Sequence, residues 1–304
     1  MNVTDALLEW NAYRTKLCGL GLVARSTLDN QIQIAAGLIV RLGDIKLERL
    51  RKSDIELWMG ERLQTCAPVT VRGEMNVLRQ VVRWAIDEGH LTVAPRFPKL
   101  TVANVEASLP GDDAFLWVLA NVPPQHAAGL EFMMLTGLSP HELERVQVQD
   151  GQGEGGTNRF DLRIGQREDF AVKQPSRKRV VPLNGRTRVL WFEAAAGAIA
   201  DTLHPFPKVD AMQKAIRRAV DAAALATNRL VGIPAPPADV AAVTPKAMRK
   251  WFASKVAGEQ PEHVLQRLMG HAPGSPITRR HYIRSSDAEV TAAADGVAIA
   301  ARTA

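Results

Sequence analysis

The chain has 304 residues, of which 46% are hydrophobic, and a formal net charge of +6 at pH 7, with an isoelectric point near 9.5. The length suits one large or two modest domains with buried cores, and the positive charge raises affinity for a polyanion such as DNA without proving that one is bound. Two cysteines, Cys18 and Cys66, exclude a disulfide framework and favour a reducing cytoplasm. The first residues do not resemble a signal peptide, and no apolar run reaches the roughly 18 residues of a membrane helix, so no membrane role is predicted.

Residues 1–92 carry apolar side chains at helical spacing and are predicted to form a helical, DNA-binding front domain. The run from Ala6 to Trp10 opens the first helix, and Asn30 to Leu42 forms the second. Ser53 and Glu56 are spaced as a capping box, in which the serine caps the next helix and the glutamate reaches back to its amide. The longest periodic segment runs from Val69 to Glu88.

The segment from Val69 to Glu88 has two different faces. Its apolar face carries Met75, Leu78, Val82 and Ile86, and its basic face carries Arg72, Arg79 and Arg83. Two interpretations of the basic face stay open. It is either an ordinary solvated face, which is the commoner case for surface charge, or a face that contacts DNA phosphates.

The stretch 93–110 contains Pro95, Pro98 and Pro110 around polar, weakly periodic residues, which is typical of a connection between domains. We therefore expect an interdomain linker at 93–110, a second domain at 111–286 and a tail at 287–304. The tail is either a helix that contacts another protomer or a helix packed on its own domain or frayed in solution.

The second domain is expected to be mainly α-helical with a small antiparallel β-sheet. Helical patterns cover residues 112–120, 125–135 and 209–227, and helices dominate from there to the end. A glycine-rich interval lies at 151–157. The strand-like runs that follow it lie at 159–164, 169–172 and 179–183.

Tyr282 is a candidate nucleophile. Only two tyrosines occur in the chain, and this one follows His271 and the basic pair Arg279 and Arg280. A phenolate that attacks a phosphodiester needs nearby positive charge to stabilise the reaction.

The second half resembles the tyrosine recombinases, the phage integrase family. The resemblance covers roughly residues 1–290 and rests on four blocks in order. These blocks are Thr136-Gly137-Leu138 with Glu142-Leu143, the turn from Lys173 to Leu183, the segment from Thr244 to Ser254, and Met269-Gly270-His271 through Tyr282. It implies a two-domain DNA clamp that cuts and rejoins DNA without metal or cofactor, through a 3′-phosphotyrosyl link.

The resemblance also implies roles for single residues. Tyr282 stands at the nucleophile's position, and Arg249 stands where the second catalytic arginine binds the scissile phosphate. His271 is expected to donate to a phosphate oxygen, with a capping or core histidine as its alternative. Lys246 occupies a position usually held by histidine and can still donate to phosphate. Lys173 is the candidate proton donor to the leaving oxygen, if the turn carries one extra residue.

Neighbouring cations on that turn keep the assignment of the proton donor open. Arg177, Lys178 and Arg179 are possible substitutes for Lys173, or they form a solvated hairpin that touches the DNA backbone. Arg279 and Arg280 are expected to contact DNA beside the active site.

The first block departs from the family at Ser139, where the family has an arginine. A serine hydroxyl is short and uncharged, so it cannot replace a bidentate cation on a phosphate. Glu142, which matches the acidic residue that braces the site, is present, and Arg145 is poorly placed on the helix to substitute. If the site is otherwise intact, the sequence predicts that Ser139→Arg raises cleavage.

The sequence is therefore compatible with two functions. One is a recombinase that acts on double-stranded DNA sites as a tetramer, either with a cation from elsewhere that replaces the missing arginine or with a partner recombinase in the same complex. The other is a weakened or inactive relative that binds DNA as an accessory or regulatory subunit. A type IB topoisomerase shares the chemistry, but the integrase-like front domain argues against it.

Overall fold

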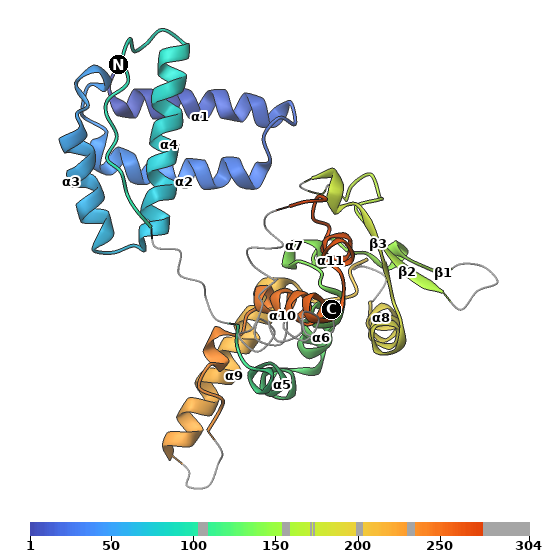
Figure 1. The fold of residues 1–304 in the computed structure, drawn as a ribbon. Coiled ribbons are helices and arrows are strands. Elements are labelled where there is room, and N and C mark those ends of the chain that lie inside the picture. The colour runs from blue at the N-terminus through green and yellow to red at the C-terminus, as the bar shows by residue number, and fades with distance from the viewer. Residues whose placement is uncertain are drawn as a thin grey trace, which may run out of the picture. The chain divides into compact units, whose positions relative to one another are not determined.

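The structure is a computed structural model that describes residues 1–102, 109–153, 159–170, 172, 174–198, 203–229 and 235–275, with only the backbone of residues 226–229. The chain divides into two compact units, Met1–Glu106 and Ala107–Ala304. Each unit has its own hydrophobic core. Figure 1 shows the first unit as a group of helices and the second as a group of helices with a small sheet at one side.

The first unit is all-helical, as the sequence predicts. Trp10, Leu38, Trp58 and Leu78 are buried in its core. Its elements are α1 (Val3–Gly19), α2 (Arg25–Leu42), the 3-10 turn η1 (Leu47–Arg49), α3 (Lys52–Leu63) and α4 (Pro68–Asp87).

Two details of this unit refine the sequence prediction. The predicted cap at Ser53 is wrong, because α3 begins at Lys52 and Asp54 Oδ2 accepts a hydrogen bond from the Arg51 amide at 2.8 Å. An aspartate at the third helical position thus binds the amide of the residue before the helix. Phe97 and Leu100 pack on this core, whereas Leu109 packs on the core of the second unit.

The second unit is built around α6, whose apolar face is buried on several sides. Phe132 on α6 contacts Phe206 at a ring-centroid distance of 4.7 Å and Trp191 at 5.9 Å. Its elements before the sheet are α5 (Asp112–Asn121), α6 (Pro124–Thr136), α7 (Pro140–Leu143) and the turn η2 (Val148–Asp150). Those after the first two strands are the turn η3 (Pro175–Arg177), α8 (Gly185–Gly197), α9 (Val209–Arg229), the turn η4 (Val240–Ala242), α10 (Pro245–Glu259) and α11 (Glu262–Met269).

The sheet has three antiparallel strands in the order β1-β2-β3. β2 (Phe160–Ile164) and β3 (Arg179–Pro182) confirm two predicted strands, with Leu162 opposite Val181. The edge strand β1 (Gly151–Gly153) lies in the glycine-rich interval, where the sequence predicts no strand. Gly151 fits there because a Cβ atom at this position would lie 2.5 Å from Trp191 Nε1.

The predicted strand at 169–172 is wrong for the residues that the structure describes in it. Asp169 lies in a turn, and its carboxylate pairs with Arg167, which also binds Asp150 at 2.7 Å. These ion pairs favour a turn over an extended strand. None of the described helices combines the length and the apolar character needed to cross a membrane.

Candidate active site

Glu142 is the centre of a buried polar cluster. Ser139 caps α7, and its Oγ accepts a hydrogen bond from the Glu142 amide at 3.3 Å while its own amide donates to Glu142 Oε2 at 2.8 Å. This capping box turns the carboxylate back toward the start of the helix. Glu142 is only 2% exposed, so its carboxylate is shielded from bulk water.

Arg179, on β3, is the main partner of this carboxylate. Its Nη1 donates to Glu142 Oε1 at 2.8 Å and its Nη2 to Oε2 at 3.1 Å, which makes a bidentate pair. Nη1 also donates to the Arg177 carbonyl at 3.2 Å. The sequence suggested either a substitute for Lys173 as proton donor or a solvated hairpin arginine that touches the DNA backbone. The structure instead buries Arg179, because it neutralises Glu142.

Arg249, on α10, is the second arginine of the cluster. Its Nη1 donates to the Gly137 carbonyl at 2.5 Å and lies 3.3 Å from Glu142 Oε2. Its Nη2 donates to the Met269 carbonyl at 2.6 Å. The guanidinium is thus held between the end of α6 and the end of α11, which is the preorganisation that a phosphate-binding arginine needs.

The three charged groups make an unusual concentration of buried charge. Four charged side chains are buried among the described residues, and Glu142, Arg179 and Arg249 are three of them, with Asp150 the fourth. Burial raises the pKa of Glu142, but the hydrogen bonds and charge of Arg179 and the charge of Arg249 outweigh it and lower the pKa to about 2. One carboxylate therefore contacts two guanidinium groups.

His271 follows this cluster at the end of α11. The helix ends at Gly270 in the left-handed conformation, with φ 64°, and the His271 amide donates to the Gln266 carbonyl at 2.8 Å. Burial and the charges of Arg249, Arg177 and Arg179 lower the pKa of His271 to about 4. The imidazole is therefore neutral at neutral pH, and the positive field around it is strong.

β3 and α11 meet closely at this point. A Cβ atom on Gly270 would lie 2.9 Å from Arg179 Nη1 and 3.0 Å from the Arg177 Cα, and Ser176 Oγ donates to the Gly270 carbonyl at 3.4 Å. Figure 1 shows the same neighbourhood of α7, β3 and α11. The structure thus brings Glu142, Arg249 and His271 together, and it adds Arg179.

Other predicted site residues lie around or away from this cluster. Arg177 is half-buried, 3.8 Å from Glu142 Oε1, whereas Lys178 is exposed. Lys246 is exposed on the first turn of α10. Tyr282, Lys173, Arg279 and Arg280 lie outside the described residues, so the structure does not place them.

Two of the three arginines predicted on the basic face of α4 are exposed, and the third is not. Arg72 and Arg83 are exposed, but Arg79 is half-buried. Its guanidinium donates to the Pro98 carbonyl at 3.3 Å and lies 5.0 Å from the centre of the Phe97 ring. Arg79 therefore fastens the chain after α4 to the front unit.

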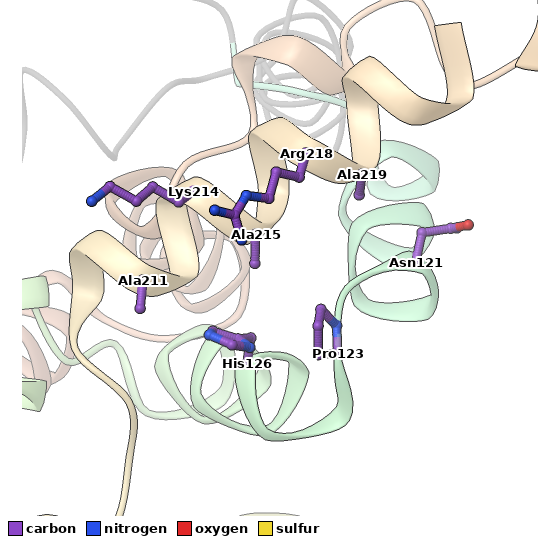
Figure 2. A pocket seen from close by; sticks show the side chains of 8 residues that line it. All are labelled: Asn121, Pro123, His126, Ala211, Lys214, Ala215, Arg218 and Ala219. Atoms are coloured by element: carbon purple, nitrogen blue, oxygen red, sulfur yellow. The ribbon is translucent and has the colours of Figure 1, made fainter. Parts of the chain in front are cut away.

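A separate pocket of about 350 Å³ opens between α5, α6 and α9. Figure 2 shows His126, Lys214 and Arg218 among the side chains that line it. None of its lining residues belongs to the cluster around Glu142. Among the described residues, no group of three or more His, Cys, Asp and Glu side chains could hold a metal ion.

Comparisons with known proteins rest on structure, because no protein-family model and no curated protein sequence matches the chain. A fragment of the Tn1549 transposon integrase, solved with a circular intermediate DNA, superposes with a TM-score of 0.72 at 17% identity, over 98% of this chain and 99% of that one. The chain has the tyrosine recombinase fold. Lambda integrase bound to a core site matches with a TM-score of 0.70 at 17% identity, over 94% and 98% of the two chains.

A third matching structure comes from a tetramer. The lambda integrase tetramer bound to a Holliday junction matches with a TM-score of 0.70 at 16% identity, over 94% of this chain and 80% of that one. At such identities the similarity shows the fold alone. It confirms the predicted class, which is mainly α-helical with a small antiparallel sheet.

Proposed function

We propose that this chain is a site-specific DNA recombinase that cleaves and rejoins strands through a 3′-phosphotyrosyl intermediate. The observation that carries the proposal is the buried cluster in which Arg179 and Arg249 share Glu142 beside His271. The fold supports it, because the matching structures that span nearly the whole chain are integrases bound to DNA.

The proposed chemistry assigns a role to each group. The Tyr282 oxygen attacks phosphorus and forms a new P–O bond, while the bond to the 5′ oxygen breaks. The leaving oxygen takes a proton, for which Lys173 is the candidate donor, and the phenol gives its proton to a base. Arg249 and His271 donate hydrogen bonds to the non-bridging oxygens, where negative charge grows in the transition state.

Neutral His271 suits this role in one specific way. With its pKa lowered to about 4, it carries a single ring N–H at neutral pH and can donate one hydrogen bond. A bound phosphate places negative charge beside the ring, which favours the imidazolium form. A bound phosphate therefore raises the pKa of His271 above this value.

The two units together are proposed to form a DNA clamp, with the exposed Arg72 and Arg83 of α4 contacting the phosphate backbone. Lambda integrase has been solved as a dimer and as a tetramer on DNA. We propose that this chain also assembles on its DNA sites, as a tetramer or with a partner recombinase, through residues 287–304. DNA as the substrate places the protein in the cytoplasm.

A covalent-capture selection tests the proposal and does not require the target sequence to be known. The protein is incubated with a library of duplexes that carry randomised sequence and a nick, so that cleavage releases a short strand and traps the protein–DNA link. Complexes that survive denaturation are isolated, and their DNA is sequenced. The proposal predicts an enriched sequence and an alkali-stable covalent adduct.

The two tyrosines of the chain provide a matched control. Tyr282→Phe should abolish the adduct, while Tyr13→Phe on α1 should leave it unchanged. If the wild-type chain forms no adduct, but a parallel selection without denaturation enriches a sequence that it binds, the accessory DNA-binding function is correct and the recombinase function is wrong. Ser139, which acts as a helix cap instead of a cation, is the feature that favours this alternative.

A further inference from the structure

We infer that Arg179 binds the scissile phosphate in place of the arginine that is absent at position 139. The inference rests on the proposed function and assigns a further catalytic residue to the same site. Arg179 comes from β3, not from the start of α7, and reaches the same carboxylate that caps α7.

Position 139 itself supplies no positive charge. Ser139 acts as the cap of α7: its amide donates to Glu142 Oε2, and its hydroxyl oxygen accepts from the Glu142 amide. The guanidinium that contacts Glu142 most closely is that of Arg179, with both carboxylate oxygens within 3.1 Å. A cation from another element therefore lies beside Glu142, at the start of α7.

The donors of Arg179 leave one edge of its guanidinium unused. A guanidinium has five N–H donors. In Arg179, Nη1 uses both of its hydrogens, on Glu142 and the Arg177 carbonyl, and Nη2 uses one on Glu142. Nε is buried and has no hydrogen-bond partner among the described residues. Nε and the second hydrogen of Nη2 form a fork that fits two oxygens of a phosphate.

Three other arginines that pair with carboxylates engage Nε. Arg62 pairs with Glu74, and Arg186 pairs with Glu131, through Nε and Nη2. Arg167 engages Nε, Nη1 and Nη2 together, on Asp169, Asp150 and the Arg145 carbonyl. Arg179 pairs end-on instead, and a buried donor without a partner is unfavourable unless a ligand satisfies it.

The surroundings of Arg179 point to an anion as that ligand. Glu142 carries one negative charge and contacts both Arg179 and Arg249, so it cannot neutralise both. Arg177 adds a third cation 3.8 Å from the same carboxylate. Gly270, immediately before His271, lies against the Arg179 head group. Gly270 lies on the Nη1 side of that head group, and the charges of Arg249 and Arg179 both act on His271, so a phosphate bound by His271 lies near both guanidinium groups.

This role changes what Ser139→Arg is expected to do. With Arg179 in place, a new arginine at 139 removes the cap of α7 and competes for Glu142, so the single substitution should not raise cleavage. It should help only when Arg179 is absent.

The test measures single-turnover cleavage of the captured DNA sequence by four variants. Arg179→Gln should lower the rate by about 100- to 1000-fold, the usual loss for one preorganised donor group. Arg179→Lys should lose less than Arg179→Gln, because it keeps the charge but not the fork. Adding Ser139→Arg to Arg179→Gln should raise the cleavage rate at least about tenfold above that of Arg179→Gln alone. Arg167→Gln is the matched control, a comparably placed ion pair outside the cluster, and should stay within about threefold of wild type.

A neutral substrate separates phosphate contact from structural support. In a methylphosphonate, a methyl group replaces one non-bridging oxygen, so the scissile group carries no negative charge. The loss caused by Arg179→Gln should then be at least about tenfold smaller than on normal DNA, since charge stabilisation is what the substitution removes. A merely structural arginine would give equal losses on both substrates.

Each outcome decides the inference. Thermal melting of every variant shows which are folded, and Arg179→Lys with the rescued double variant replaces Arg179→Gln if the latter does not fold. Equal losses on both substrates without rescue by Ser139→Arg, or a folded Arg179→Gln that cleaves like wild type, overturn the role of Arg179 and leave the recombinase function intact. A wild-type chain that forms no adduct overturns both.

Discussion

At the scale of single residues, the site depends on one carboxylate. Glu142 is buried, ionised and shared by two arginines from different elements, and its own helix is capped through the same group. The pKa of about 2 shows that the arginines more than compensate for the cost of burying the charge. Removal of this carboxylate therefore breaks two ion pairs and a helix cap at once.

Glu142→Gln should lower the free energy of unfolding by about 3–5 kcal/mol, because it leaves two buried guanidinium groups without their counter-charge. Urea unfolding at neutral pH measures this. Glu131→Gln is the matched control, because Glu131 forms an equally short pair with the exposed Arg186, and it should cost less than about 1 kcal/mol. Similar costs for the two substitutions would contradict the assignment of a buried charge cluster.

His271 predicts a pH dependence of stability with a definite sign. Its pKa is about 4 in the folded chain and 6.5 when unperturbed, so between these values the unfolded chain binds more protons. Its contribution to stability is complete above pH 6.5 and is lost as the pH falls toward about 4. Glu142 loses its contribution at lower pH, as the pH falls from 4.5 toward about 2.

We therefore expect His271→Gln to flatten the fall in the free energy of unfolding between pH 6.5 and about 4. Urea titrations across this window compare the variant with wild type. Parallel curves for the two proteins would mean that burial and the nearby arginines do not act on His271 as the structure indicates.

At the scale of elements, the site is a junction of short segments. α7, β3, α10 and the end of α11 each contribute one or two groups, and Gly270 lets β3 and α11 approach closely. The geometry of the cluster therefore depends on the turn after α11 as well as on the charged side chains.

Gly270→Ala tests this junction. Its added methyl group meets Arg179 Nη1 at 2.9 Å, so it should displace the guanidinium and lower cleavage by at least about tenfold, the loss expected when a catalytic group moves by a fraction of an ångström. Gly274→Ala is the control, because Gly274 also has a positive φ, 71°, but its added methyl group meets nothing within 4 Å. The same backbone strain acts in both, so equal losses would show that strain alone is responsible.

The elements themselves were largely predictable from the sequence. Apolar spacing located α2, α4, α5, α6 and α9 to within a few residues, since these helices bury one face against a core. β1 was missed because its glycines carry no strand signal and pair only through the backbone. The predicted strand at 169–172 failed because ion pairs of Arg167 hold its first half in a turn.

The site was predictable where a motif carried it and not elsewhere. Arg249, His271 and Glu142 follow from the resemblance, and the structure brings them together. Arg179 was expected at the surface of a hairpin, because nothing in the sequence indicates that β3 brings it to a carboxylate 37 positions away. Such a pairing depends on the register of the sheet and on the packing of α11. The local spacing of apolar and charged residues does not encode either of these.

At the scale of the whole molecule, positive charge is what would attract the DNA backbone to the proposed clamp. The net charge of +6 and the exposed Arg72 and Arg83 on α4 favour phosphate contacts. Arg79 shares their helix face in the sequence, but in the structure it binds the chain at Pro98 and Phe97. Only the two exposed arginines of this face are therefore expected to act on DNA.

The dependence of DNA affinity on salt concentration tests whether Arg72 and Arg83 contact DNA phosphates. Each phosphate contact adds about 0.9 to the slope of the logarithm of affinity against the logarithm of salt concentration, so Arg72→Gln with Arg83→Gln should reduce the slope by nearly twice that amount. Arg25→Gln with Arg41→Gln removes the same net charge from exposed arginines on α2 that already pair with acidic side chains, and should leave the slope nearly unchanged. Equal changes in the two double variants would assign the effect to net charge alone. An unchanged slope for both would make the basic face of α4 a solvated surface and would leave DNA binding to the second unit.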